Sequence, residues 1–154
     1  MNITYYVAFF LLGAVLIREL LYLKDLNIST KKNIGEVLII IIGIITVVTI
    51  SVIFAKNTVH YVMGCVGLGL LIADWSKQGI SKNGILLVAR GKELYVWNEI
   101  QEASINISNK IKIDYFITSN SKIVSQYYSV DAYDKILKEF KNQGVTFKII
   151  HNTN

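Results

Sequence analysis

Three long uncharged runs dominate the first half of the chain, and the second is the clearest. Residues 37–55 carry no charged side chain, and 14 of these 19 positions are Leu, Ile, Val or Phe. A helix of this length rises about 28 Å, close to the roughly 30 Å hydrocarbon core of a bilayer. We therefore predict a transmembrane helix over residues 37–55. The alternative is a buried helix or strand of a soluble core, although a strand of this length would be far longer than usual.

The first and third runs are shorter. Residues 3–23 are uncharged except for Arg18 and Glu19, whose long side chains can reach the headgroups from near the end of a span. A cleaved signal peptide is the alternative, but the run lacks a basic start and a small-residue cleavage site. Residues 58–73 form the third predicted span, with a re-entrant segment as the alternative. Three glycines in this run would let helices approach closely in lipid: Gly64, Gly67 and Gly69.

The distribution of basic residues predicts the orientation of three such spans. Cytoplasmic flanks carry an excess of Lys and Arg. Here only Lys56 lies between the second and third spans, while the first loop and the start of the C-terminal region are basic. We predict a cell-membrane protein with its N-terminus outside and its C-terminal domain in the cytoplasm. The residues expected at the inner membrane interface are Arg18, Lys24, Lys31, Lys32, Trp75, Lys77 and Lys82.

From residue 76 the long runs give way to the alternation that is typical of strands. Asn83-Gly84 is a favoured hairpin turn between expected strands at 79–81 and 85–89, and Arg90-Gly91 turns the chain into a strand at 94–100. Further strands are expected near 105–107, at 110–118 and, at a sheet edge, at 122–130 after a turn at 118–121. We expect these strands to form one curved antiparallel sheet.

The period then changes to that of a helix. Ala132, Tyr133, Ile136, Leu137 and Phe140 share one helical face. Asp131 is the expected N-cap, Gly144 the expected stop, and residues 145–149 alternate as a last strand. The predicted organisation is a three-helix transmembrane region at 1–75 followed by a small α+β domain at 76–150, an antiparallel sheet plus a C-terminal helix.

Two short motifs in this domain support a resemblance. The run from Gln78 to Ile85, followed by Trp97-Asn98-Glu99-Ile100, resembles the "GI…G…W-x-E-I" pattern of PH-like domains in uncharacterised membrane proteins of Gram-positive bacteria. The helix containing Tyr133 to Leu137 fits the same pattern. The resemblance covers residues 76–150 and implies a PH-like partial barrel capped by its helix. A ferredoxin-like sheet is the alternative.

Trp97 and Glu99 each have two interpretations. As structural residues, Trp97 packs on the sheet and Glu99 accepts a hydrogen bond from a backbone group or turn. As functional residues, the two form part of a groove for a peptide or protein partner. A lone Trp in a strand usually belongs to the core, which favours the structural interpretation.

The composition argues against catalysis and metal binding. The chain has 53% apolar and 18% charged residues, no proline, and one cysteine, Cys65, inside an apolar run where an inert side chain is expected. His60 and His151 are far apart, and no zinc, P-loop or nucleophile-elbow spacing occurs. We therefore expect no enzyme activity, no cofactor and no metal.

The net charge of +5 could suggest nucleic acid, but the lysines are dispersed and no groove-binding helix is evident. Attraction of the basic flanks to anionic lipid is the simpler account, acting on orientation without lipid specificity. Arg18 and Glu19 either extend to the headgroups or form a functional ion pair within the membrane.

These observations favour an interaction protein: a membrane-anchored adaptor whose domain binds a protein partner or a lipid headgroup, with homo-oligomerisation open. The resemblance extends to small bacterial membrane proteins that protect against membrane-active bacteriocins, which implies a role in bacteriocin resistance or envelope stress. The alternative is an accessory subunit of a membrane transporter or enzyme complex, using the glycines of the third span to contact a larger partner.

Overall fold

The chain folds into two compact units. The computed structural model describes residues 3–87, 93–118 and 122–151. Unit 1 comprises residues 1–24 and 33–77, and unit 2 comprises residues 25–32 and 78–154. The expected boundary after residue 75 therefore misses one segment. The loop between the first two long helices, residues 25–32, belongs to the second unit because it supplies a strand to a sheet there.

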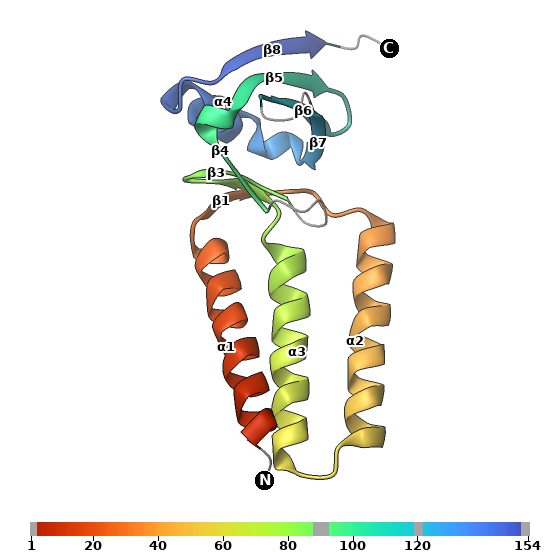
Figure 1. Ribbon diagram of the computed structural model, residues 1–154. Helices are drawn as coiled ribbons and strands as arrows, with labels where there is room; N and C mark the ends of the chain where they lie inside the picture. Colours follow the sequence, from red (N-terminus) through yellow and green to blue (C-terminus); the bar gives the residue numbers. More distant parts are fainter. Residues whose placement is uncertain (1–2, 88–92, 119–121, 152–154) are drawn as a thin grey trace. The chain divides into compact units, whose positions relative to one another are not determined.

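Unit 1 contains three long apolar helices: α1 (Ile3–Lys24), α2 (Ile34–Phe54) and α3 (Thr58–Ser76). Among the described residues, these three helices are long and apolar enough to cross a membrane. They confirm that the three predicted segments are long apolar helices, with ends that differ by a few residues. Within this unit α3 lies between α1 and α2 and packs against both (Figure 1).

Two asparagines define where α2 and α3 begin. The side chain of Asn33 accepts a hydrogen bond from the Glu36 amide at 2.8 Å, and that of Asn57 accepts one from the His60 amide at 3.2 Å. Each satisfies an amide that lacks a partner within its helix. The Asn33 cap is why α2 begins three residues before the predicted span.

Unit 2 contains two four-stranded sheets within the part of the chain that the structure describes. The first has the order β1-β2-β3-β4, all antiparallel, from β1 (Leu26–Ser29), β2 (Gly79–Ser81), β3 (Gly84–Leu86) and β4 (Leu94–Val96). The second has the order β7-β6-β5-β8, from β5 (Ile100–Ile107), β6 (Ile111–Ile117), β7 (Lys122–Tyr128) and β8 (Thr146–His151).

This topology corrects the expectation of one antiparallel sheet. The predicted strand at 94–100 is interrupted by a 3-10 turn at Trp97–Glu99, so the chain leaves the first sheet at Val96 and enters the second at Ile100. β8 runs parallel to β5. Parallel strands need a long crossover connection, which the helix α4 (Tyr133–Asn142) supplies between β7 and β8. The expected edge position of β7 is confirmed.

The β2–β3 hairpin differs from its prediction by one residue. Ser81 pairs with Gly84, so the two turn residues are Lys82 and Asn83 and not Asn83 and Gly84. Gly84 has φ +151°, and a Cβ added there would meet the Tyr95 carbonyl oxygen of β4. The glycine is needed for the close approach of two strands. The predicted continuation to residue 89, the Arg90-Gly91 turn and most of the turn at 118–121 lie outside the described residues.

Helix α4 confirms the predicted apolar face but not the predicted cap. Ile136 and Phe140 are buried in the core. Asp131 lies in a 3-10 turn (Val130–Ala132), and its carboxylate accepts a hydrogen bond from the Ser129 hydroxyl. The helix ends as predicted before Gly144, which has φ +68°. The Val145 amide donates to the Phe140 carbonyl, which closes a Schellman motif.

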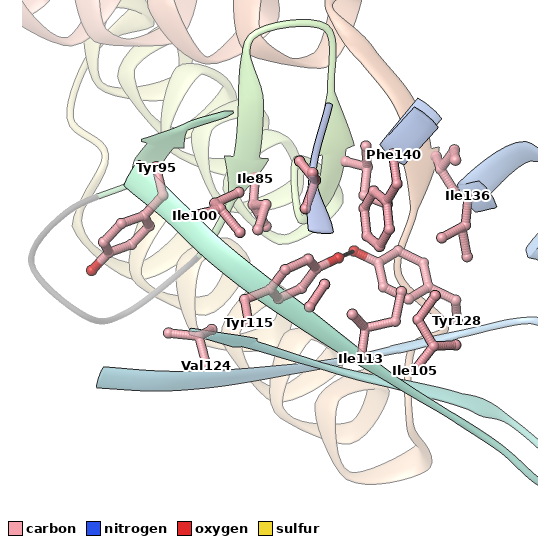
Figure 2. Close-up of a cluster of buried hydrophobic side chains, with 14 of the residues drawn as sticks. Ile85, Tyr95, Ile100, Ile105, Ile113, Tyr115, Val124, Tyr128, Ile136 and Phe140 are labelled. Carbon is pink, nitrogen blue, oxygen red and sulfur yellow. Dashed lines mark hydrogen bonds between the residues drawn. The ribbon is translucent and has the colours of Figure 1, made fainter. Parts of the chain in front are cut away.

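The core of unit 2 lies between the two sheets and α4. Figure 2 shows Ile85 of β3 beside Ile100, Phe140 of α4 over the two tyrosines Tyr115 and Tyr128, and all of them in one buried cluster. Phe140 contacts the rings of Trp97, Tyr115 and Phe147 at centroid distances of 6.0–6.1 Å. Ile28 of β1 is buried in the same cluster. The loop between two long helices is therefore an integral part of this core.

Candidate functional site

Four charged side chains meet near the ends of α1 and α3 in unit 1. The Lys77 ammonium lies 2.6 Å from a Glu19 carboxylate oxygen and 2.7 Å from Asp74 Oδ1. The other oxygen of Glu19 accepts a hydrogen bond from the Arg18 guanidinium at 2.7 Å. Two positive and two negative side chains of unit 1 are thus linked by ion pairs. We call Arg18, Glu19, Asp74 and Lys77 the ion-pair cluster.

The centre of the ion-pair cluster is shielded from solvent. The Lys77 side chain is 0% exposed and that of Glu19 4%, whereas Arg18 and Asp74 are about half exposed. The Lys77 ammonium also lies 5.9 Å from the centre of the Tyr22 ring, within the range of a cation–π contact. Of the two interpretations of Glu19, the structure places it in an ion pair. Its partner is on α3, which no spacing within α1 could reveal.

The ion-pair cluster has a clear physical role. Removing one member of a buried ion pair leaves an uncompensated charge, which typically costs about 3–5 kcal/mol. Loss of Glu19 or Lys77 alone would therefore weaken the contact between α1 and α3, because the other residue would stay buried without this partner. Because Lys77 is buried, it is not available as an exposed cation for headgroups, unlike its predicted role.

The other residues predicted at the membrane interface belong to both units. In unit 1, Lys24 is the exposed last residue of α1 and Trp75 is partly buried near the end of α3. In unit 2, Lys31 and Lys82 are exposed and Lys32 is partly buried. Lys82 lies at the tip of the β2–β3 hairpin. Lys31 lies just after β1, and its amide donates to the Tyr127 carbonyl at the outer edge of β7.

Trp97 and Glu99 both make contacts within unit 2. The Trp97 indole N–H donates to the Lys82 carbonyl at 3.0 Å, and its ring packs against Phe140. The Glu99 carboxylate accepts a hydrogen bond from the Val96 amide at 3.3 Å, which closes the 3-10 turn. Both contacts match the structural interpretation of these residues. Both residues lie in the 3-10 turn and not in the predicted strand at 94–100.

The three glycines of α3 all face helices of the same chain. A Cβ added at Gly64 would lie 2.3 Å from the Ser51 hydroxyl oxygen of α2, and one added at Gly69 would lie 3.5 Å from Leu16 of α1. A Cβ at Gly67 would meet only Val47, at 4.0 Å. The predicted helix packing through small residues is therefore found between α3 and its two neighbours within unit 1.

A buried polar chain connects the two sheets of unit 2. The Tyr115 and Tyr128 hydroxyls lie 3.1 Å apart and point toward each other (Figure 2). Tyr128 donates to the Gln126 side-chain oxygen at 2.5 Å, and the Gln126 amide donates to the Leu86 carbonyl of β3 at 2.8 Å. Burial raises the pKa of Tyr115 and of Tyr128 well above the ordinary value near 10, so both phenols stay protonated at neutral pH.

The face of the second sheet that points away from the core carries a mixed surface. Phe116 of β6 pairs with Ile123 of β7, and Lys112 pairs with Tyr127. Ile123 and Tyr127 are about half exposed. Between them, Asp114 accepts hydrogen bonds from Ser125 and from Lys112 at 2.5 and 2.9 Å, and the latter raises the pKa of Lys112. We call Lys112, Asp114, Phe116, Ile123, Ser125 and Tyr127 the outer face.

Sequence reasoning did not identify the outer face as a candidate site. The alternation of residues 110–118 predicted which side chains face the core, but not which strand lies beside them. The pairing of Phe116 with Ile123 depends on the register between β6 and β7, which a turn within residues 118–121 does not specify on its own. The signal that could have found it is the apolar residue at position 116 on the otherwise polar side of its strand.

The two histidines belong to different units. His60 lies at the start of α3, where its Nδ1 accepts a hydrogen bond from the Lys56 amide at 3.0 Å. The side chain of His151 lies outside the described residues. Cys65 is exposed on the surface of α3.

Comparison of the chain with protein-family models, curated proteins and solved structures gave no match.

Proposed function

We propose that this chain is a membrane-anchored adaptor, in which unit 1 spans a bacterial cell membrane and unit 2 binds a protein partner in the cytoplasm. The observation that carries the proposal is the outer face. It presents an aromatic and an aliphatic residue, Tyr127 and Ile123, at an edge strand beside a hydrogen-bonded Lys112–Asp114 pair. Aromatic anchors next to satisfied polar groups are typical of protein interfaces.

The surface of unit 1 supports the anchor. Few side chains of the three helices are buried within the fold, and many large apolar ones, especially those of α2, are exposed. Such a surface requires lipid as its solvent. The bias of basic residues toward the first loop and the C-terminal region supports a cytoplasmic unit 2.

Cysteine accessibility tests the orientation. In a Cys65→Ala background, Lys56→Cys lies in the α2–α3 turn and Asn109→Cys in the β5–β6 turn, both exposed. A membrane-impermeant maleimide added to intact cells should label the first and not the second. Labelling of Asn109→Cys alone would show that the orientation is the opposite of the proposed one. Labelling of both after permeabilisation is the control for reactivity.

Cross-linking in membranes, followed by affinity purification and mass spectrometry, tests the outer face as the binding surface. Ile123→Glu should reduce recovery of the partner at least tenfold, because a charge replaces an exposed apolar contact. Lys135→Gln on α4 changes the net charge by the same amount at an exposed site and should leave recovery unchanged. Equal recovery from both variants would contradict the proposal. If only anionic phospholipid is recovered, unit 2 binds a headgroup instead.

A PH-like identity for unit 2 is part of the proposal. Two sheets that share a core with α4 support the resemblance carried by the Trp97-Asn98-Glu99-Ile100 motif. The strand β8, which follows the helix and pairs in parallel with β5, departs from that pattern. An experimental structure of unit 2 within the whole chain is the direct test.

A role in resistance to membrane-active bacteriocins is the physiological form of the proposal. Cells lacking the protein should then show a lower inhibitory concentration for such peptides, restored by the intact chain but not by Ile123→Glu. Unchanged sensitivity across a panel of peptides would count against this role while leaving the binding test unaffected. The alternative, an accessory subunit that binds through the α3 glycines, has less support because Gly64 and Gly69 already face α2 and α1.

A further inference from the structure

Unit 1 contains an apolar groove that its own side chains leave unfilled. Its volume is about 410 Å³, within the range of roughly 300–1,000 Å³ found for small-ligand sites. All three helices contribute to it, and it lies toward the end where α2 turns into α3. Its lining includes Leu12 of α1, Val47 and Phe54 of α2, and His60, Met63 and Gly67 of α3.

The arrangement of the helices explains the groove. α3 lies between α1 and α2 (Figure 1), and all three helices contribute lining residues, most of them from α2 and α3. Gly67 provides no side chain, and a Cβ there would still lie 4.0 Å from Val47. In contrast, the α2–α3 contact one turn away, at Gly64 and Ser51, is already tight.

We propose that this groove binds one acyl chain of a membrane phospholipid, with the phosphate near Lys56. From His60 to Gly67 the lining extends seven residues along α3, about 10 Å at 1.5 Å per residue. A helix is about 10–12 Å wide with its side chains, too bulky for a space of this volume, whereas an extended hydrocarbon chain is thin enough. The lining is largely apolar, so it offers an acyl chain contacts without unpaired polar groups.

Charge points to the phospholipid headgroup. Lys56 is exposed and lies in the turn between α2 and α3, at the same end as the groove. Between Glu36 and Asp74 it is the only Lys, Arg, Asp or Glu in the sequence. A phosphate beside Lys56 would therefore lie next to a cation, with no carboxylate on the neighbouring parts of α2 and α3.

Native mass spectrometry of the full chain with added phosphatidylglycerol tests the site. The wild-type chain should retain one lipid after the detergent is removed. Gly67→Leu fills the groove and should reduce the retained fraction at least tenfold. Gly13→Leu adds the same side chain where a Cβ meets nothing within 4 Å, and should retain the lipid as the wild type does. Lys56→Gln should weaken retention several-fold.

Further variants and outcomes make the test decisive. Val47→Phe fills the same groove from α2, so a misfolded Gly67→Leu variant, detected by circular dichroism, does not end the test. Undiminished lipid retention in a folded groove-filling variant would overturn the proposal. So would a mass showing that a second copy or another polypeptide, and not a lipid, is lost when the groove is filled.

Discussion

The carboxylate of Glu19 in α1 lies 2.6 Å from the ammonium of Lys77, which caps the C-terminal end of α3, and both side chains are buried. The two residues are 58 positions apart in the sequence. Their contact joins two of the three long helices at one end. Arg18 pairs with Glu19 and Asp74 pairs with Lys77, so both belong to the same ion-pair cluster.

Breaking this pair from one side should be costly. We expect Lys77→Met to lower the free energy of unfolding by about 3–5 kcal/mol, because Glu19 would be left buried without its main counter-charge. The double variant Glu19→Gln, Lys77→Met should be more stable than Lys77→Met alone. Arg18→Gln, at a half-exposed position, should cost less than about 1 kcal/mol. Thermal unfolding in detergent measures these variants together with Glu19→Gln alone. If the effects of Glu19→Gln and Lys77→Met simply add in the double variant, the pairing is contradicted.

The strand β1 should be needed for the stability of unit 2, although it lies in the loop between two long helices. Ile28 is 7% exposed and belongs to the core cluster of that unit. We expect Ile28→Ala to cost about 2–5 kcal/mol through the cavity it leaves. Ser29→Ala, at an exposed position of the same strand, is the control and should have little effect. Amide hydrogen exchange in β2 and β3 reports the change, and equal protection in both variants would show that β1 is dispensable.

Gly84 should tolerate no side chain. Its φ is +151°, and a Cβ would lie 2.0 Å from the Tyr95 carbonyl oxygen, so Gly84→Ala must displace β3 from β4. We expect a loss of at least about 1–3 kcal/mol. Gly144→Ala has a positive φ but open space around the Cβ, and should cost only about 1–2 kcal/mol. Urea unfolding of both variants measures the difference, and a smaller effect at Gly84 than at Gly144 would contradict the close strand approach.

The sequence predicted the elements whose patterns are local. Residues 37–55 indicated a helix because their apolar run is long, and the apolar stripe ending at Phe140 indicated α4. Which strands pair with one another was harder to predict from the sequence. Nothing in Leu26-Asn27-Ile28-Ser29 indicates that this four-residue segment pairs with Gly79–Ser81, because a short apolar segment between helices is equally compatible with a loop. The parallel position of β8 beside β5 likewise depends on the crossover and not on the strand's own alternation.

In the candidate site, too, the sequence indicated single residues but not their partners in the fold. Arg18 and Glu19 were recognised as unusual within an apolar run, but the partner of Glu19 could not be chosen among many cations. Lys77 was placed at the membrane interface because its position in the chain follows a span, whereas its side chain turns back to Glu19 and Asp74. The motif around Trp97 drew attention to this residue, but it does not specify what the side chain contacts. Its contacts with Lys82 and Phe140 depend on tertiary structure.

Because of the buried tyrosine pair, the stability of unit 2 should vary with pH in the alkaline range. Burial raises the pKa of Tyr115 and Tyr128 above the value near 10 that a phenol has in the unfolded chain. The folded state therefore favours the protonated phenols. Their contribution is fully present below about pH 10 and is lost as the pH rises from there toward the folded-state pKa values, because the unfolded chain then releases protons that the folded chain retains.

We therefore expect the free energy of unfolding of unit 2 to fall with pH above about 10. Tyr115→Phe removes one titrating group and the hydroxyl that lies beside Tyr128, so its profile should fall less steeply at a cost of about 1 kcal/mol at neutral pH. Tyr127→Phe removes a half-exposed phenol on the outer face and should keep the wild-type slope. Urea unfolding between pH 7 and pH 11, followed by hydrogen exchange in β6 and β7, measures these slopes. Parallel profiles for Tyr115→Phe and the wild type would show that the buried phenols do not control alkaline stability.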